Sequence, residues 1–298
     1  MYDAIIVGMG PAGMSAGVYT KRAGLKTLIL DEFAPGGLLN KISIVENYLG
    51  FKSITGQELA LKMFEHVRNE EIEYKIEKVL NIIDNKDHKV VITSKGEYKT
   101  KGVIIAIGRK PKKSGIANEE KYIQKGISYC AICDAALYKD KEIVVLGGGN
   151  SAIEESIYLS KFASKITVLA RSELKANDEL IEEAKEKGIN IRIGVEVTEF
   201  LGETNIEGVK LNTEEIIPCK GVFIYYGYQA DTAFLNALGI TDEKGYIEVN
   251  EKMESKIDKI YACGDIIKKD IYQISTAVSD GTIAALSLQK DIRNIDNN

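Results

Sequence analysis

Two cysteines separated by two residues are the part of this sequence that most directly indicates chemistry. They lie in the run Cys130-Ala131-Ile132-Cys133-Asp134, and helix-compatible residues follow. We therefore expect the pair at the start of a helix, where the positive end of the helix dipole stabilises a thiolate. One thiolate can attack a disulfide while the other resolves the mixed disulfide. Asp134 is the candidate proton donor and acceptor, because reducing a disulfide takes up protons as well as electrons.

Two other interpretations of the cysteine pair stay open, half of a zinc site and an inert pair. A zinc site needs two further ligands, and the other cysteines are Cys219 in an apolar strand context and Cys263 in a separate motif. His66 and His88 are the only histidines, and we expect both on the surface. Four cysteines in 298 residues do not form a secreted disulfide framework. The expectation is redox chemistry without a metal.

A glycine-rich turn near the N-terminus predicts a dinucleotide site. The apolar run Tyr2 to Val7 leads into Gly8-Met9-Gly10-Pro11-Ala12-Gly13, which is followed by a helical pattern and a second apolar run ending at Asp31. Glycines let the backbone approach a pyrophosphate, and the N–H groups at the helix start attract its charge. Asp31 stands where a carboxylate can accept hydrogen bonds from ribose hydroxyls. A structural turn without a ligand is the alternative.

A second unit of strand, glycine turn and helix follows later in the chain. Glu142 to Leu146 leads into Gly147-Gly148-Gly149-Asn150-Ser151-Ala152. The next strand ends at Ala170, which offers neither a carboxylate for a ribose nor a guanidinium for a 2′-phosphate. Arg171 and Lys175 are the remaining candidates for phosphate contacts. The sequence leaves open whether this turn binds a pyridine nucleotide or is an inherited fold that binds one poorly.

The order of expected elements predicts an α/β fold with two Rossmann-like, three-layer nucleotide-binding domains. The length of 298 residues favours two cores. Alternation of polar and apolar residues around Val90 and Ile92 predicts antiparallel strands in the first domain, and a helix at 178–187 before a strand at 189–193 favours a second parallel sheet. The basic run Arg109 to Lys113 predicts a hinge, with a return crossing near Asp242 to Gly245.

Composition and charge narrow the classes of partner. The chain is 45% hydrophobic and 28% charged, has a formal net charge of −5, and disperses its basic residues outside the run Arg109 to Lys113. This balance does not indicate a nucleic-acid partner. No apolar stretch is long enough to cross a bilayer, and no basic signal peptide precedes the first strand. We expect no membrane partner and a cytoplasmic location.

Taken together in their order, the motifs resemble those of the low-molecular-weight thioredoxin reductases of bacteria, from Tyr2 to about Ala285. The resemblance covers the active-site stretch, the loop that contacts the isoalloxazine, the second FAD motif and the start of the closing helix. The segments, in chain order, are Gly36-Gly37-Leu38-Leu39, Val45-Glu46-Asn47-Tyr48, Gly126 to Asp134, Tyr261-Ala262-Cys263-Gly264-Asp265, Tyr272-Gln273-Ile274 and Asp280-Gly281. The order of these motifs is more specific than any one of them.

The resemblance implies an FAD-binding domain made of residues 1–112 and 245–298, with an NAD(P)H-type domain, 113–244, inserted between them and a homodimer as the assembly. Cys133 would receive electrons from the flavin, and Cys130 would form the mixed disulfide with thioredoxin. Rotation of the inserted domain would alternate the pair between flavin and solvent, and Cys263 would serve packing. The implied FAD contacts are Gly8, Gly10, Pro11, Ala12, Gly13, Asp31, Gly36, Gly37, Leu38, Leu39, Asn47, Ala106, Gly108, Gly264, Asp265, Tyr272, Gln273 and Ile274.

Several departures from the family pattern bear on the electron donor. The basic cluster that binds NADPH in the family is replaced by Leu169-Ala170-Arg171, while Leu38, Ile107 and Tyr272 replace a Gln, a Thr and an Arg. Relatives in clostridia and other anaerobes take electrons from ferredoxin and would show such a loss of arginines. We therefore favour reduced ferredoxin over NADPH or NADH. The run Arg109 to Lys113 is either a docking segment for an acidic carrier or a solvated hinge.

The resulting expectation is a thioredoxin-disulfide reductase in which electrons pass from the donor to FAD, to Cys130 and Cys133, and then to thioredoxin. An NADPH-dependent or NADH-dependent thioredoxin reductase is the alternative. A ferredoxin or flavin reductase would share the two domains without needing the cysteine pair. A flavin-binding redox sensor would dock a partner and turn nothing over. The candidate pyridine nucleotide contacts are Gly147, Gly149, Asn150, Ser151, Ala152, Arg171 and Lys175.

Overall fold

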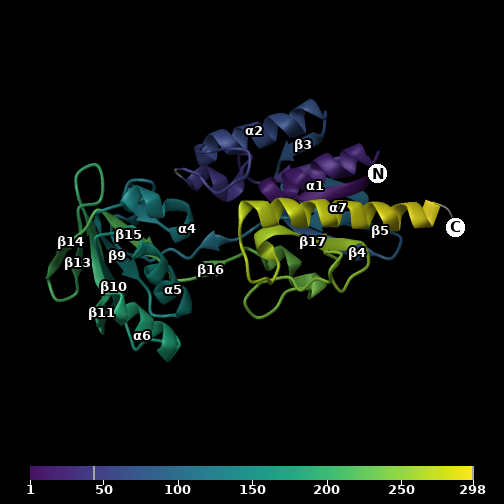
Figure 1. Cartoon of the computed structure of the whole chain (residues 1–298). Coiled ribbons are helices and arrows are strands. Elements are labelled where there is room, and N and C mark those ends of the chain that lie inside the picture. Colours follow the sequence, from purple (N-terminus) through teal and green to yellow (C-terminus); the bar gives the residue numbers. More distant parts are fainter. Residues whose placement is uncertain (43, 297–298) are drawn as a thin grey trace.

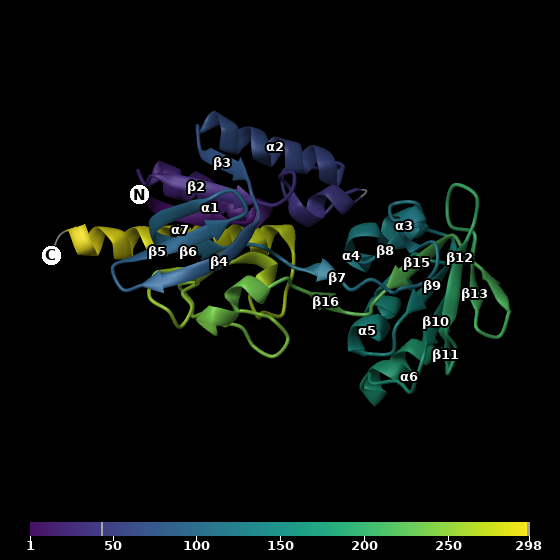
Figure 2. The same cartoon turned by 180° about the vertical axis from the view of Figure 1, so that it is seen from behind.

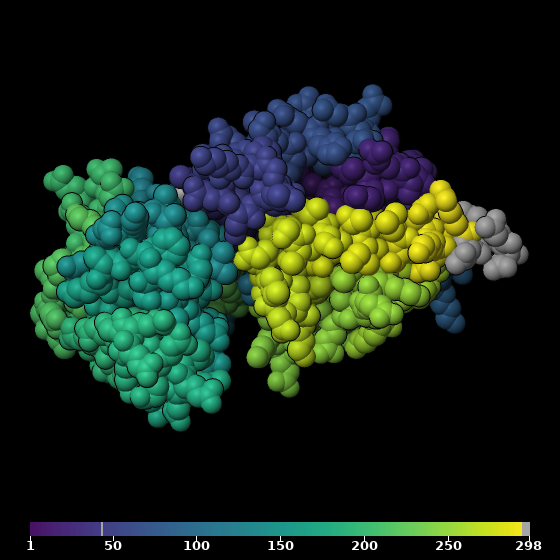
Figure 3. All heavy atoms as spheres, in the orientation of Figure 1, coloured from purple at the N-terminus to yellow at the C-terminus, as the bar shows by residue number. Residues whose placement is uncertain are grey.

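The computed structural model describes residues 1–42 and 44–296 and has two domains connected by a pair of very short strands (Figures 1 and 2). Strand β7 (Lys110–Pro111) pairs antiparallel with β16 (Tyr228–Gln229), where the chain leaves the first domain and returns to it. The space-filling view shows the domains as two lobes that meet along one edge (Figure 3). None of the described helices is long and apolar enough to cross a membrane.

The first domain is built on a seven-stranded sheet to which both ends of the chain contribute. The order is β3-β2-β1-β6-β5-β4, and β17 also pairs with β6. Strands β1, β2, β3, β6 and β17 are mutually parallel where they pair, and β4, β5 and β6 form the expected antiparallel part. The strands are β1 (Tyr2–Val7), β2 (Thr27–Asp31), β3 (Glu73–Ile76), β4 (Val79–Asn85), β5 (His88–Thr93), β6 (Glu97–Ile105) and β17 (Ile260–Ala262).

Two helices far apart in the sequence cover one face of this sheet side by side, α1 (Pro11–Arg22) and α7 (Ile274–Asp296) (Figure 1). Gly281 of α7 allows the two helices to pack closely, since a Cβ at this position would lie 2.2 Å from the Ala12 carbonyl oxygen of α1. Helix α2 (Gly56–Asn69) begins with a capping box between Thr55 and Glu58. Among the residues that the structure describes, this domain also has short 3₁₀ turns at η1 (Gly37–Lys41), η3 (Ala233–Leu238) and η4 (Gly264–Ile266).

The inserted domain has a five-stranded parallel sheet in the order β11-β10-β9-β15-β8. Separate apolar clusters line its two faces, one toward the helices and one toward a three-stranded sheet. The elements are α3 (Glu119–Tyr122), β8 (Ile127–Ser128), α4 (Ala131–Asp134), η2 (Ala135–Tyr138), β9 (Glu142–Leu146), α5 (Asn150–Leu159), β10 (Lys165–Ala170), α6 (Asp178–Glu186), β11 (Asn190–Ile193), β12 (Val197–Leu201), β13 (Gly208–Leu211), β14 (Ile216–Pro218) and β15 (Gly221–Ile224).

The predicted α/β fold with two Rossmann-like domains is confirmed, but the return crossing lies earlier than expected. Leu235 and Ile240 are buried in the same apolar cluster as Ile5 and Val103 of the first domain. The chain therefore re-enters the first domain at β16 and not near Asp242 to Gly245. The sequence misled here because η3 fills the core through a short turn, which has no strand or helix periodicity to reveal its partner.

Candidate active site

The cysteine pair forms a disulfide at the start of α4, with a Cα–Cα distance of 5.3 Å. Cys130 is the N-cap residue, and its Sγ accepts a hydrogen bond from the Cys133 N–H at 3.2 Å. Helix α4 spans a single turn, so the expected stabilisation by a helix dipole reduces to this one N–H group. Both cysteines are half-buried, and α4 lies on the side of the inserted domain that faces the first domain (Figures 1 and 2).

Asp134 lies beside the disulfide in an environment suited to proton transfer. Ser128 donates a hydrogen bond from Oγ to Asp134 Oδ2 at 2.6 Å, and the same Oγ accepts from the Cys130 N–H at 3.2 Å. Oδ1 is buried and has no hydrogen-bond partner among the described residues. Burial raises the pKa of Asp134, and the Ser128 hydrogen bond opposes that rise. The sequence singled out Asp134 but missed Ser128.

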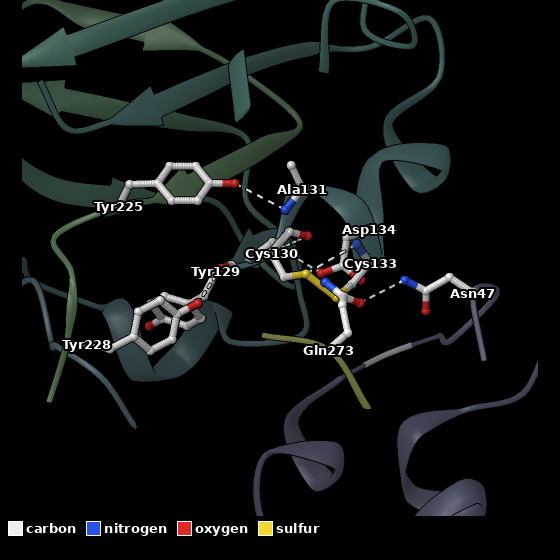
Figure 4. Close-up of a disulfide and its surroundings, with 10 residues drawn as sticks. Asn47, Tyr129, Cys130, Ala131, Cys133, Asp134, Tyr225, Tyr228 and Gln273 are labelled. Atoms are coloured by element: carbon white, nitrogen blue, oxygen red, sulfur yellow. Dashed lines mark hydrogen bonds between the residues drawn. A yellow bond between two sulfur atoms is a disulfide. The ribbon is translucent and has the colours of Figure 1, made fainter. Parts of the chain in front are cut away.

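Two tyrosines that follow β15 form hydrogen bonds with the backbone of the disulfide segment. The Tyr225 hydroxyl accepts a hydrogen bond from the Ala131 N–H at 3.1 Å, and the Tyr228 hydroxyl donates to the Tyr129 carbonyl oxygen at 2.9 Å (Figure 4). Burial raises the pKa of Tyr225 well above its ordinary value, so this hydroxyl keeps its proton. No local sequence pattern could have shown these contacts, because they join residues more than 90 positions apart.

The first domain presents two expected flavin contacts near the disulfide. Asn47 Nδ2 donates to Gln273 Oε1 at 3.2 Å, which joins the loop after η1 to the residue before α7. Figure 4 draws this pair among the immediate surroundings of the disulfide. A different hydrogen bond crosses between the domains, from Gln124 Nε2 to the Asn40 carbonyl oxygen at 3.1 Å. The predicted loop, closing-helix start and cysteine pair therefore come together in space.

The first glycine turn has the shape that a dinucleotide needs. A Cβ on Gly8 would lie 2.3 Å from the Ala106 carbonyl oxygen, and one on Gly13 would lie 1.9 Å from the Gly8 carbonyl oxygen. Gly10 is different, because nothing lies within 4 Å of its Cβ position. The α1 N-terminus therefore borders open space next to a backbone that only glycine allows. These residues fit the pyrophosphate of FAD.

The other expected FAD contacts surround this turn. Both oxygens of Asp31 accept backbone hydrogen bonds, from Met9 and from Phe33 at 2.9 Å, and burial raises the pKa of this carboxyl. The remaining lone pairs could accept from a ribose. Gly264 packs against α1, since its Cβ would lie 2.8 Å from the Ala12 Cβ. The others lie at the start of α1, in or before η1, at or after the end of β6, in η4, and at or before the α7 start: Pro11, Gly36, Gly37, Leu38, Leu39, Gly108, Asp265, Tyr272 and Ile274.

The second glycine turn is partly occupied by its own chain. The Lys175 N–H donates to the Gly148 carbonyl oxygen at 2.7 Å, and the Asn177 N–H donates to Asn150 Oδ1 at 3.0 Å. Ala170 is buried, and its Cβ lies 3.2 Å from the Cβ position of Gly148. The Gly149 Cβ position is open, as at Gly10. Ser151 and Ala152 lie in the first turn of α5, as predicted.

Arg171, the expected phosphate ligand of the second turn, already has partners. Its guanidinium lies 4.6 Å from the centroid of the Tyr226 ring, and Nη1 lies 3.9 Å from Glu196 Oε1. A nearby carboxylate lowers the affinity of such a site for a phosphate. Lys175 is exposed and contributes its backbone to closing the turn. The side chains of this turn favour a nucleotide less than those of the first.

Comparison with known proteins bears on this geometry. A family model described as pyridine nucleotide-disulphide oxidoreductase matches residues 2–281. The thioredoxin reductase of Bacillus subtilis is 43% identical over 297 residues, which cover 97% of this chain and 94% of the relative. The chain belongs to the thioredoxin reductase family. This confirms the family named from the motifs and the enzyme class, a flavin-dependent disulfide oxidoreductase.

Solved structures of thioredoxin reductases superpose on this family member to different extents. The enzyme from Streptococcus pyogenes gives a TM-score of 0.93 at 39% identity, with 99% of each chain covered. The Lactococcus lactis enzyme, described as an FR conformation, gives 0.70 at 40% identity, with 99% of this chain and 100% of that chain covered. Identity and coverage are nearly equal, so sequence divergence does not account for the lower score.

Proposed function

We propose that this protein is an FAD-dependent thioredoxin-disulfide reductase whose reducing electrons leave through Cys130. The observation that supports this most strongly is the disulfide itself. It lies between the buried carboxyl of Asp134, whose pKa burial raises, and the Asn47–Gln273 pair of the domain that carries the first glycine turn. Bound FAD would supply two electrons at that face. Cys133 is the sulfur assigned to receive them, as the family resemblance implies.

The cysteines account for every bond that breaks or forms in the exchange, and Asp134 is the proposed carrier of one proton. Two electrons break the Cys130–Cys133 bond and leave two sulfurs, one of which takes a proton. The Cys130 thiolate then attacks the disulfide of thioredoxin, and the departing thioredoxin sulfur takes a proton. Cys133 gives up its proton as it attacks Cys130 of the mixed disulfide, which restores the internal disulfide. The second thioredoxin sulfur leaves as a thiolate and takes a proton from water, which completes dithiol thioredoxin. We assign Asp134 to give a proton to the first departing thioredoxin sulfur and to recover one from Cys133. Its buried Oδ1, which has no hydrogen-bond partner among the described residues, supports this role.

This cycle needs the inserted domain to move. The half-buried cysteines lie beside Asn47 and Gln273 of the first domain (Figure 4), so thioredoxin cannot reach them freely in this arrangement. A rigid rotation about β7 and β16 would expose them without changing either domain. The TM-scores of 0.93 and 0.70 at nearly equal identity are what two arrangements of the same domains would give. The two antiparallel linkers are short enough to act as a hinge.

The test of the proposed function is a trapping experiment. Cys133→Ser keeps the attacking thiol and removes the resolving one, so it should form a stable mixed disulfide with thioredoxin that is visible on a non-reducing gel. Cys130→Ser should form none and should lose thioredoxin reduction while its flavin can still be reduced. Cys263→Ser is the matched control, because that thiol is fully buried. Full disulfide reductase activity in Cys130→Ser would refute the mechanism.

For the electron donor we propose reduced ferredoxin. Three features of the second glycine turn support this choice: Ala170 replaces a ribose or phosphate ligand, Arg171 is paired with Tyr226 and Glu196, and the 171–177 loop bonds back to Gly148. Anaerobic mixing with NADPH, NADH and photoreduced ferredoxin in turn, followed by the flavin absorbance, decides between donors. Fast bleaching by NADPH and none by ferredoxin would overturn the proposal.

NADPH or NADH is the second candidate donor, because the Gly149 Cβ position is open like that of Gly10.

A homodimer is the assembly that the resemblance implies, and light scattering of the purified protein tests it. A redox sensor would reduce at most one equivalent of thioredoxin, whereas the proposed enzyme turns over with excess substrate. Steady-state reduction of thioredoxin separates the two.

A further inference from the structure

Arg109, the residue before β7, is the centre of an aromatic cluster at the junction of the domains. Its guanidinium carbon lies 3.9 Å from the ring centroid of Tyr228 in β16 and 3.5 Å from that of Tyr272. The Arg109 side chain is only 13% exposed. Cation–π contacts are stronger where the cation has lost water, so both stacks contribute. The cation thus joins the returning hinge strand to the segment that precedes α7.

Polar contacts of the same guanidinium are with the first domain. Nη1 lies 3.3 Å from the Tyr246 hydroxyl, and Nε lies 3.8 Å from Asp265 Oδ2. Nε is buried without a hydrogen-bond partner among the described residues. A buried cation with incomplete hydrogen bonding contributes little net stability. The role of Arg109 therefore lies in the positions in which it holds the neighbouring residues.

Those residues connect the two sides of the active site. Tyr228 donates a hydrogen bond to the Tyr129 carbonyl oxygen at 2.9 Å, immediately before Cys130. Tyr272 immediately precedes Gln273, which Figure 4 draws near the disulfide together with Asn47. The sequence of contacts Tyr272, Arg109, Tyr228, Tyr129 is thus a continuous tie between the flavin-side segment and the disulfide segment.

We propose that Arg109 is a positioning residue that holds the disulfide against the flavin-side pair Asn47–Gln273. The inference rests on the domain movement of the proposed function and names the contact that opposes it. If Tyr228 moves with the inserted domain, its stack on Arg109 breaks. If Tyr228 stays with the first domain, its hydrogen bond to Tyr129 breaks. A rotation about β7 and β16 therefore breaks one of the two contacts. Arg109 thus favours the arrangement in which the disulfide lies against the first domain over the rotated one.

The test measures how often the reduced cysteines become accessible. The holoenzyme is reduced with dithiothreitol, freed of reductant, and alkylated with limiting iodoacetamide, and the modified cysteines are counted by mass spectrometry. Arg109→Ala removes both stacks, and Tyr228→Phe keeps the ring and removes only the hydrogen bond to Tyr129. Lys112→Ala is the matched control, an exposed cation of the same run. FAD content and the urea midpoint are measured for each variant to show that it is folded.

We expect Arg109→Ala and Tyr228→Phe to raise the alkylation rate of the dithiol by about tenfold, and Lys112→Ala to leave it unchanged. Small-angle scattering of the same samples should show a larger share of the rotated arrangement. Wild-type alkylation rates and scattering in both folded variants would overturn the proposal. Failure of wild-type protein to reduce thioredoxin would refute the proposed function instead. The alkylation rates of the variants could still be compared, because that assay needs only the dithiol and the two domains.

Discussion

Replacing Gly10 by Ala should separate cofactor binding from folding. Nothing lies within 4 Å of a Cβ at Gly10, and its φ of −77° suits any L-residue. Gly13, three residues later, is the opposite case, because its Cβ would lie 1.9 Å from the Gly8 carbonyl oxygen. The protein without bound FAD should therefore tolerate a methyl group at position 10 but not at position 13. A pyrophosphate at the α1 N-terminus would meet the methyl group at position 10.

The magnitudes follow from these distances. Ala is a poorer N-cap than Gly but restricts the unfolded chain, so Gly10→Ala should change the stability of the apoprotein by less than about 1 kcal/mol. Gly13→Ala forces backbone apart and should cost about 3 kcal/mol or more. At position 10 the methyl group intrudes on the bound dinucleotide at a cost of about 1 to 3 kcal/mol, roughly tenfold to a hundredfold in the Kd for FAD.

The assay is a urea titration of the apoprotein followed by circular dichroism, together with an FAD titration followed by flavin fluorescence. Gly96→Ala is the control, since Gly96 lies in the exposed turn between β5 and β6 and also has nothing within 4 Å of its Cβ position. We expect weaker FAD binding in Gly10→Ala alone of these two. An FAD affinity equal to that of Gly96→Ala would refute the placement of the cofactor.

The same substitution in the second turn addresses the donor. Gly149→Ala puts a methyl group into equally open space at the start of α5, where the N-cap φ is −93°. If ferredoxin is the donor, this variant should reduce thioredoxin from photoreduced ferredoxin at the wild-type rate. A wild-type activity with NADPH that Gly149→Ala abolishes would contradict the donor proposal.

Three further predictions concern proton transfer, pH and folding. Asp134→Asn should lower thioredoxin turnover by about a hundredfold in stopped-flow assays while dithionite still reduces the flavin, because the amide cannot hold the proton. Burial raises the pKa of Glu155 to about 7, with Glu154 adding to it. The folded protein therefore loses stability as pH rises through that value, because the buried carboxyl must then ionise. Glu155→Gln, discounted for its partial exposure, should therefore stabilise the protein against urea by about 1 to 2 kcal/mol at pH 8.5 and by nothing at pH 4.5. Thr55→Ala should cost about 1 kcal/mol in the same urea assay through loss of the α2 capping box, and an unchanged midpoint would contradict that role.

Local sequence patterns predicted the buried strands and the glycine turns that follow them, because these features depend on residues close together in the sequence. The run Tyr2 to Val7 coincides with β1, and Glu142 to Leu146 coincides with β9, because buried parallel strands are short apolar runs closed by glycine turns. The return of the chain at β16 was not predictable, since the alternation of residues does not show which core η3 fills. The stacking of Tyr228 on Arg109 joins residues that no period or motif relates.

The positions that escaped prediction share a physical origin. Tyr225 and Tyr228 follow β15, which pairs with β8 directly before the disulfide, so the sheet register places their hydroxyl groups over the backbone at 129–131. Those two tyrosines also lie at the entrance to the returning hinge strand. The segment that moves the inserted domain is thus the segment that holds its reactive sulfurs. Substitutions in the hinge should consequently affect the chemistry of the disulfide before they affect the stability of either domain.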